Sequence, residues 1–181
     1  MNVTIRRGRA GDAERLAELA EEVFPLACPP HHTRENINKH LAEVLSEDDF
    51  EEYASDDDYD LFVAESNGHL VGFALLDTLA CDDEEVEPLL AGVHPNMELS
   101  KLYVHPDAHG SGVAQQLFDE IDAAARDRSA TSLWLTVWMD NARALAFYRR
   151  NGFEVVGDRF YPVGDLLDHD YVAVKVFSKG D

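Results

Sequence analysis

The chain has 181 residues, 45% of them hydrophobic and 9% aromatic, and it carries a formal net charge of -21 at pH 7. This length predicts a single domain over residues 1–181, and the apolar share argues against a disordered chain because it can fill a core. The anionic surface repels DNA, RNA and anionic membranes, so we expect none of these as partners.

The acidity has two interpretations, and the sequence leaves both open. Lysine is rarer than arginine, which fits an acid-rich or salt-adapted proteome, but the same charge would also gather a cationic substrate. Cys28 and Cys81 have no C-x-x-C spacing, and the chain opens without an apolar leader, which predicts a reduced, cytoplasmic location. No apolar run approaches the roughly 20 residues that span a bilayer.

The first predicted elements are a strand and a helix. Residues 2–7 alternate and are β-branched, which is typical of a strand. Apolar residues recur at helical spacing over 11–24, and Asp12 is the expected cap of this helix. The stretch over 25–32 is expected to break it, because Pro25, Pro29 and Pro30 cannot continue a helix.

A helical arm is predicted next. Thr33 is expected to cap a helix over 35–45, and Ser46 with Asp49 forms a capping arrangement for a short third helix. The acidic run over 55–60 is interpreted as a solvated loop, because it lacks the glycine and spaced glutamate of a calcium site.

A hairpin is the clearest signal in the middle of the chain. Two apolar runs, 61–66 and 69–77, are joined by Asn67-Gly68, a pair that tolerates positive φ in a two-residue turn. An acidic connection of unassigned structure covers 81–96. The later elements are expected in this order: a strand over 98–105, a helix over 113–128, a strand over 132–138, a helix over 141–152 capped by Asp140 or Asn141, and strands over 153–162 and 168–177 joined by 165–168.

This order predicts a mixed α/β arrangement of layers. The fourth and fifth strands flank the helix over 113–128, so we expect them to run parallel through a crossover connection.

The stretch HPDAHGSGVAQQL places Gly110 and Gly112 between a strand and a helix. The first backbone amides of a helix have no partner within it, and its dipole adds positive charge there, so an anion can bind. A plain loop before a helix is the alternative. The segment lacks the third glycine of a dinucleotide motif and the Lys-Ser or Lys-Thr of a nucleoside-triphosphate loop.

Two segments together carry a family resemblance, LSKLYVHPDAHGSGVAQQL and WLTVWMDNARALAFYRRNGFEVVG. They resemble the GCN5-related N-acetyltransferase (GNAT) superfamily, and with FYPVGDLLDHDYVAVK they are similar to its bacterial PaiA-like group, related to spermidine/spermine acetyltransferases. The resemblance implies the acyl-CoA N-acyltransferase fold, with a mostly antiparallel sheet of about seven strands, the fourth and fifth parallel and splayed, flanked by helices.

The same resemblance implies where acetyl-CoA, as co-substrate, would bind. The pantetheine arm would pair with the backbone of Leu102, Tyr103 and Val104, although Leu102 and Val104 also suit core packing. The loop pattern Arg/Gln-x-x-Gly-x-Gly/Ala would hold the pyrophosphate, and histidine stands here where the family has arginine or glutamine. The matching loop residues are His109, Gly110, Ser111, Gly112, Val113 and Ala114.

Three further residues match functional positions of the superfamily. Tyr148 matches its general acid, with a core position as the alternative. Glu98 matches a general base that acts through water, with a solvated carboxylate or an attractor of the cationic substrate as alternatives. Asn141 matches a contact to pantetheine, and capping its own helix is an equal alternative.

The expected activity is direct transfer of the acetyl group from acetyl-CoA to the primary amine of a small molecule such as a polyamine. The alternatives are a protein or peptide amino group as acceptor, and a non-catalytic CoA-binding regulatory module on the same fold. We expect no metal, because His31 and His32 stand beside prolines, and His105 and His109 are interrupted by Pro106. A homodimer is implied by the family alone.

Overall fold

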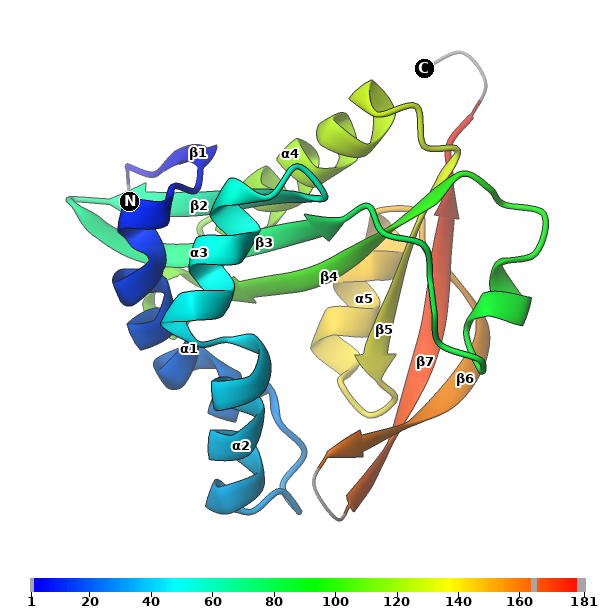
Figure 1. Cartoon of the computed structure of the whole chain (residues 1–181), viewed down its shortest axis with the longest axis horizontal. Coiled ribbons are helices and arrows are strands. Elements are labelled where there is room, and N and C mark those ends of the chain that lie inside the picture. The colour runs from blue at the N-terminus through cyan, green and yellow to red at the C-terminus, as the bar shows by residue number, and fades with distance from the viewer. Residues whose placement is uncertain (1, 164–165, 179–181) are drawn as a thin grey trace.

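Seven strands of the described residues form one sheet (Figure 1), in the spatial order β1-β2-β3-β4-β5-β7-β6. The computed structural model describes residues 2–163 and 166–178. The strands are β1 (Thr4–Arg7), β2 (Tyr59–Ser66), β3 (His69–Asp77), β4 (Asn96–Val104), β5 (Ser132–Trp138), β6 (Glu154–Val163) and β7 (Leu166–Val176). All neighbours pair antiparallel except β4 and β5, which are parallel. The expected mixed sheet is confirmed.

The helices lie on both faces of this sheet (Figure 1). They are α1 (Ala13–Ala27), α2 (Arg34–Val44), α3 (Glu47–Ser55), α4 (Val113–Asp127) and α5 (Ala142–Arg150). Helices α1 to α3 form the arm on one face, and α4 and α5 cover the other face. Among the described residues, none of the helices has the length and apolar character that crossing a membrane requires.

Two hydrophobic clusters hold the layers together. Phe118 and Ile121 of α4 are almost fully buried against the sheet, and Leu16 of α1 packs with Phe50 of α3 and Phe73 of β3 on the other face. A smaller cluster joins the acidic connection before β4 to β5 and β7. The site described below therefore lies between firmly packed walls.

A bulge in β4 divides that strand into two parts. Leu75 pairs with Lys101 and Leu76 with Leu99, so Ser100 is an inserted residue without a partner in β3. Met97 and Leu99 pack in the core under α4 before the bulge, and Leu102 and Val104 do so after it. The intervening residues project to the arm: Tyr103 packs in the cluster under α1, and the Lys101 ammonium lies 4.8 Å from the centre of the Tyr53 ring of α3.

Strands β4 and β5 pair only at one end. The paired residues are Asn96 to Glu98 in β4 and Ser132 to Trp134 in β5. Beyond Glu98 the two parallel strands diverge, as the family resemblance implies. An opening in a parallel pair leaves backbone groups of β4 without a neighbouring strand on that side.

Local turn and cap signals are confirmed. Asn67 and Gly68 have φ of 52° and 80° in the turn between β2 and β3. The Thr33 hydroxyl accepts a bond from the Asn36 amide at 3.2 Å, and Ser46 and Asp49 form a reciprocal capping box at α3. These residues fix the start of two helices of the arm.

The first helix differs from its prediction at both ends. Helix α1 continues through Pro25 to Ala27. Proline so close to the end removes one hydrogen bond, and the break comes instead at Cys28, before Pro29. The Asp12 side chain does not cap α1, because it binds the Arg6 guanidinium at 2.7 and 2.8 Å.

Three strand boundaries also differ. The run over 55–60 is not a loop throughout, because Tyr59 and Asp60 begin β2, and Asp60 is buried between Arg7 and Arg128. The connection predicted over 165–168 belongs largely to β7, which includes residues 166–168, while residue 165 lies outside the described residues. Strand β4 begins at Asn96, earlier than predicted.

Candidate active site

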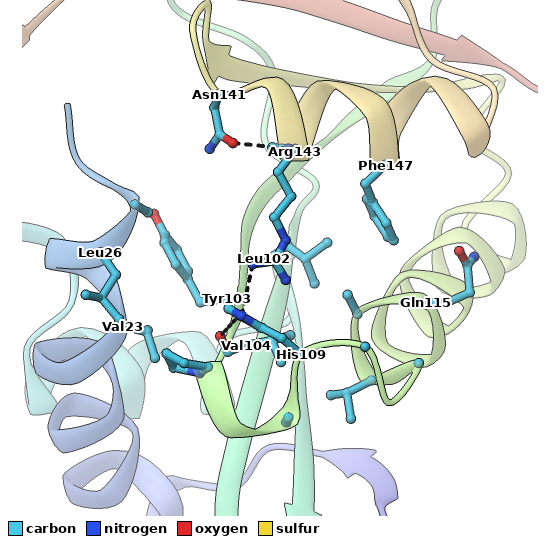
Figure 2. Close-up of a pocket in the computed structure, with 18 of the residues that line it drawn as sticks. Val23, Leu26, Leu102, Tyr103, Val104, His109, Gln115, Asn141, Arg143 and Phe147 are labelled. Atoms are coloured by element: carbon cyan, nitrogen blue, oxygen red, sulfur yellow. Dashed lines mark hydrogen bonds between the residues drawn. The ribbon is translucent and has the colours of Figure 1, made fainter. Parts of the chain in front are cut away.

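A cavity of about 530 Å³ opens where β4 and β5 diverge (Figure 2). Its walls come from α1, the second half of β4, the loop and first turn of α4, and α5. The lining residues are Val23, Leu26, Ala27, Leu102, Tyr103, Val104, Pro106, Ala108, His109, Gly110, Gly112, Val113, Ala114, Gln115, Asn141, Arg143, Ala144, Phe147, Tyr148 and Arg150. Most of the residues predicted to bind the cofactor therefore lie around one space.

The glycine loop forms the floor of this cavity. Gly110 and Gly112 have φ of 77° and 85°, a left-handed conformation that side chains rarely adopt, and Gly112 immediately precedes α4. The first turn of α4 carries no acidic side chain, so its amides retain their affinity for an anion. Ser111 does not line the cavity; its hydroxyl donates to the Ala108 carbonyl at 2.6 Å.

His109 connects the loop to both neighbouring walls. Its Nε2 lies 2.9 Å from the carbonyl of Val104, and its Nδ1 lies 2.9 Å from the Arg143 guanidinium of α5. Since a guanidinium only donates, Nδ1 accepts and the Nε2–H donates to Val104. Figure 2 shows the Arg143 side chain crossing the cavity from α5 to reach this ring. The imidazole thus holds a permanent cation over the glycine loop.

Helix α5 contributes Asn141 and Tyr148. The Asn141 side-chain oxygen accepts a bond from the Ala144 amide at 3.1 Å, so this residue caps its helix and lines the cavity at once. Tyr148 packs between Phe147 and Phe153, with ring centres 5.5 and 5.7 Å away. Burial raises the pKa of Tyr148 to about 12, so its hydroxyl is protonated at neutral pH.

Glu98 lies apart from these residues, in the paired part of β4, and is not among the described residues that line the cavity. It stands between Met97 and Leu99, which pack under α4, and therefore projects toward the arm. Burial, and then the neighbouring carboxylate of Asp77, raises the pKa of Glu98 to about 7. Such a carboxylate can accept a proton near neutral pH.

Further titratable groups gather on this arm side. Burial raises the pKa values of the Asp77 and Asp170 carboxyls. Burial also lowers the pKa of Lys101, on the same side of β4. His40 of α2 stacks on Phe24, and burial lowers its pKa to about 4. The carboxyls share this side of the site with two cations, because Lys101 and Arg159 lower the pKa of Glu98 and Arg159 lowers that of Asp170.

Several wall residues were not predicted from the sequence. Arg143, Phe147 and Gln115 line the cavity, as do Val23 and Leu26 of α1 (Figure 2). The signal for Arg143 and Phe147 is their helical spacing: residues four apart share a face, as Ala144 and Tyr148 also do. Val23 and Leu26 carry no such signal, because helix α1 reaches the cavity only through the tertiary fold.

Comparison with known proteins agrees with this geometry. The profile of the Acetyltransferase (GNAT) family matches residues 14–153. An uncharacterised N-acetyltransferase of Mycobacterium tuberculosis is 38% identical over 164 residues, which cover 91% of this chain and 97% of the relative. The chain therefore belongs to the GNAT family, and it is an acetyl-CoA-dependent N-acetyltransferase.

Solved structures share the fold. The PaiA N-acetyltransferase of Thermoplasma acidophilum, in complex with coenzyme A, superposes with a TM-score of 0.76 at 22% identity, over 98% of this chain and 100% of that one. Arabidopsis thaliana NAA60, in complex with a bisubstrate analogue, gives 0.74 at 17% identity, over 98% and 100%. At these identities the likeness shows the fold, and the fold alone does not identify the acceptor.

Proposed function

We propose that this enzyme transfers the acetyl group of acetyl-CoA to a primary amine of a small cationic molecule, with polyamines as the leading class. The observation that carries this proposal is the half-buried pair of carboxyls Asp77 and Glu98 on the arm side of the site, together with the half-buried Asp170 of β7. Carboxylates in a partly desolvated setting attract ammonium groups strongly. An acidic peptide would be repelled by the same charges and by the net charge of -21.

The cofactor would occupy the cavity. The amides around Gly110 and Gly112 would bind the pyrophosphate, and the β4 edge at Leu102 to Val104 would pair with the pantetheine arm. Ser111 and Val113 would contribute backbone amides, and the small side chain of Ala114 would leave room for the cofactor beside the first turn of α4. The complex of PaiA with coenzyme A supports this assignment for the fold.

Arg143 would supply the charge that the loop itself lacks. Position 109 holds a histidine, whose two ring nitrogens are already engaged with Val104 and Arg143. A guanidinium is always charged and suits phosphate oxygens, so we assign the phosphate contact to Arg143 and a positioning role to His109. Asn141 would orient the cofactor while it caps α5.

Chemistry would proceed by direct attack. A protonated amine first loses a proton to Glu98, directly or through water, because only the neutral amine carries the lone pair that attacks the thioester. The new C–N bond forms as the C–S bond breaks, and the departing thiolate takes the hydroxyl proton of Tyr148. The nitrogen then loses its surplus proton, which returns to the tyrosinate and restores the Tyr148 hydroxyl. The two cysteines are unsuited to a covalent route, since burial raises the pKa of Cys28 to about 11 and also raises that of Cys81.

The deciding experiment is release of free CoA thiol with a panel of acceptors: spermidine, spermine, monoamines, amino acids, and basic and acidic peptides. We expect turnover with polyamines at an apparent KM that rises with added salt, because salt screens the carboxyls. Turnover with peptides alone would assign a peptide amino group as the acceptor. Acetyl-CoA binding without thiol release, equal in wild type and Tyr148→Phe, would instead indicate a regulatory module.

A further inference from the structure

Three metal-ligating side chains converge at the end of the sheet beside the arm. His31 and His32 lie in the connection from α1 to α2, and Asp168 lies near the start of β7. The Nε2 atom of His31 lies 3.1 Å from Asp168 Oδ1, and the Nε2 atom of His32 lies 2.8 Å from the same oxygen. The three ligand atoms all lie within 4.8 Å of one another. Figure 1 shows these two segments reaching the same end of the molecule.

The burial of this cluster is uneven. The His32 side chain is 2% exposed and that of Asp168 is 9% exposed, whereas His31 is 50% exposed. A carboxylate and an imidazole are therefore fixed inside, and the second imidazole covers them from solvent. The buried Nδ1 of His32 has no hydrogen-bond partner among the described residues. Because the converging atoms are the Nε2 atoms, this Nδ1 is not one of the candidate ligand atoms.

The spacing and the chemistry of the donors suit a borderline divalent cation. Ligand atoms at the ordinary 2.0–2.1 Å from a tetrahedral zinc lie roughly 3.3 Å apart. The two separations from Asp168, 2.8 and 3.1 Å, need only a few tenths of an ångström of widening, while the two imidazole nitrogens, which lie within 4.8 Å of each other, must come to the same spacing. Two imidazoles and one carboxylate are ligands that zinc and its neighbours accept, and that magnesium and calcium do not prefer.

The surroundings also favour a cation. Asp170 follows two residues later on the same strand and therefore on the same face of the sheet, where it adds a second carboxyl. This cluster could not be predicted from the sequence, because His32 and Asp168 are 136 residues apart. The residues around His31 and His32 show no local ligand spacing, and they do not indicate that Asp168 lies beside them.

We propose that His31, His32 and Asp168 bind one transition-metal cation of the zinc class, which ties the helical arm to β7. The cation links the two walls that border the arm side of the site, and it thereby fixes their separation. Three protein ligands leave a fourth position for water on the exposed side of His31. This inference is independent of the acetyl acceptor and of the reaction.

The test is equilibrium dialysis of tag-free, chelator-stripped enzyme against Zn²⁺, in high salt with excess Mg²⁺ to suppress binding by the acidic surface. We expect one Zn²⁺ per chain, and at least a tenfold loss of affinity in His31→Gln and in Asp168→Asn. Folding of each variant is checked by circular dichroism. His169→Gln is the matched control, since His169 is the next residue of β7 but contacts Asp158 and Phe160 instead.

Cobalt gives a second readout. Co²⁺ bound by the cluster should show the intense visible absorption of a four-coordinate site. His31→Gln should abolish this absorption, and His169→Gln should preserve it. The proposal is overturned if wild type binds no zinc under these conditions, or if His31→Gln, Asp168→Asn and wild type bind it equally. Either result would make the cluster a hydrogen-bonded tie between the arm and the sheet.

Discussion

The pH dependence of turnover tests the assignment of Glu98 most directly. Its pKa is raised to about 7, so the proton-accepting form is scarce below that pH and predominates above it. The ionised fraction grows from about 9% at pH 6 to about 91% at pH 8, which predicts a roughly tenfold rise in kcat/KM for the acceptor. Tyr148, with a pKa of about 12, stays protonated throughout this range.

The assay is thiol release across this pH range, with rates expressed against total amine, because a primary amine with a pKa of about 10 stays almost wholly protonated up to pH 8 and so adds no titration of its own. Glu98→Gln should lose the rising limb together with most of the activity. Asp77→Asn should move the limb to lower pH, because it removes a negative charge that raises the pKa of Glu98. A limb with the same midpoint in Glu98→Gln would refute the reasoning.

Three other variants probe the remaining assignments. Tyr148→Phe should lower kcat roughly 100-fold or more while acetyl-CoA affinity, measured by calorimetry, is retained, because only the proton donor is lost; unchanged kcat would remove Tyr148 from the reaction. Arg143→Gln should weaken acetyl-CoA binding about tenfold, whereas Arg149→Gln, on the same helix but outside the cavity wall, should not; equal affinities would contradict a phosphate contact. Gly72→Ala should lower the free energy of unfolding by about 1–3 kcal/mol in denaturant titrations, since the new Cβ would lie 2.9 Å from a backbone oxygen of β4, while Gly11→Ala meets nothing within 4 Å and serves as control.

Local signals in the sequence predicted most elements well. The Asn67-Gly68 turn, the caps at Thr33 and Ser46, and the strand over 132–138 depend on neighbouring residues, and the structure confirms them. Pro25 was misjudged because the effect of a proline depends on its distance from the end of the helix. Asp60 was misjudged because its two arginine partners come from distant parts of the chain.

The residues of the site also divide into those that contiguous motifs predicted and those that only the tertiary fold reveals. The glycine loop and Tyr148 are contiguous motifs, so the sequence placed them beside one cavity. The contact between Arg143 and His109 joins α5 to a loop 34 residues earlier, and no periodicity in one segment can reveal it. The separation of Glu98 from the cavity was equally hidden, since it depends on where along the chain β4 and β5 stop pairing.

The inserted Ser100 changes which residues of β4 face each side of the sheet. Odd-numbered residues of β4 face α4 before Ser100, and even-numbered residues face it afterwards. If Ser100 were instead paired in a regular strand without the bulge, inside and outside would exchange for every later residue, so that Leu102 and Val104 would turn toward the arm and Tyr103 toward α4. A substitution scan of β4 should therefore show a two-residue rhythm that reverses phase at this single position.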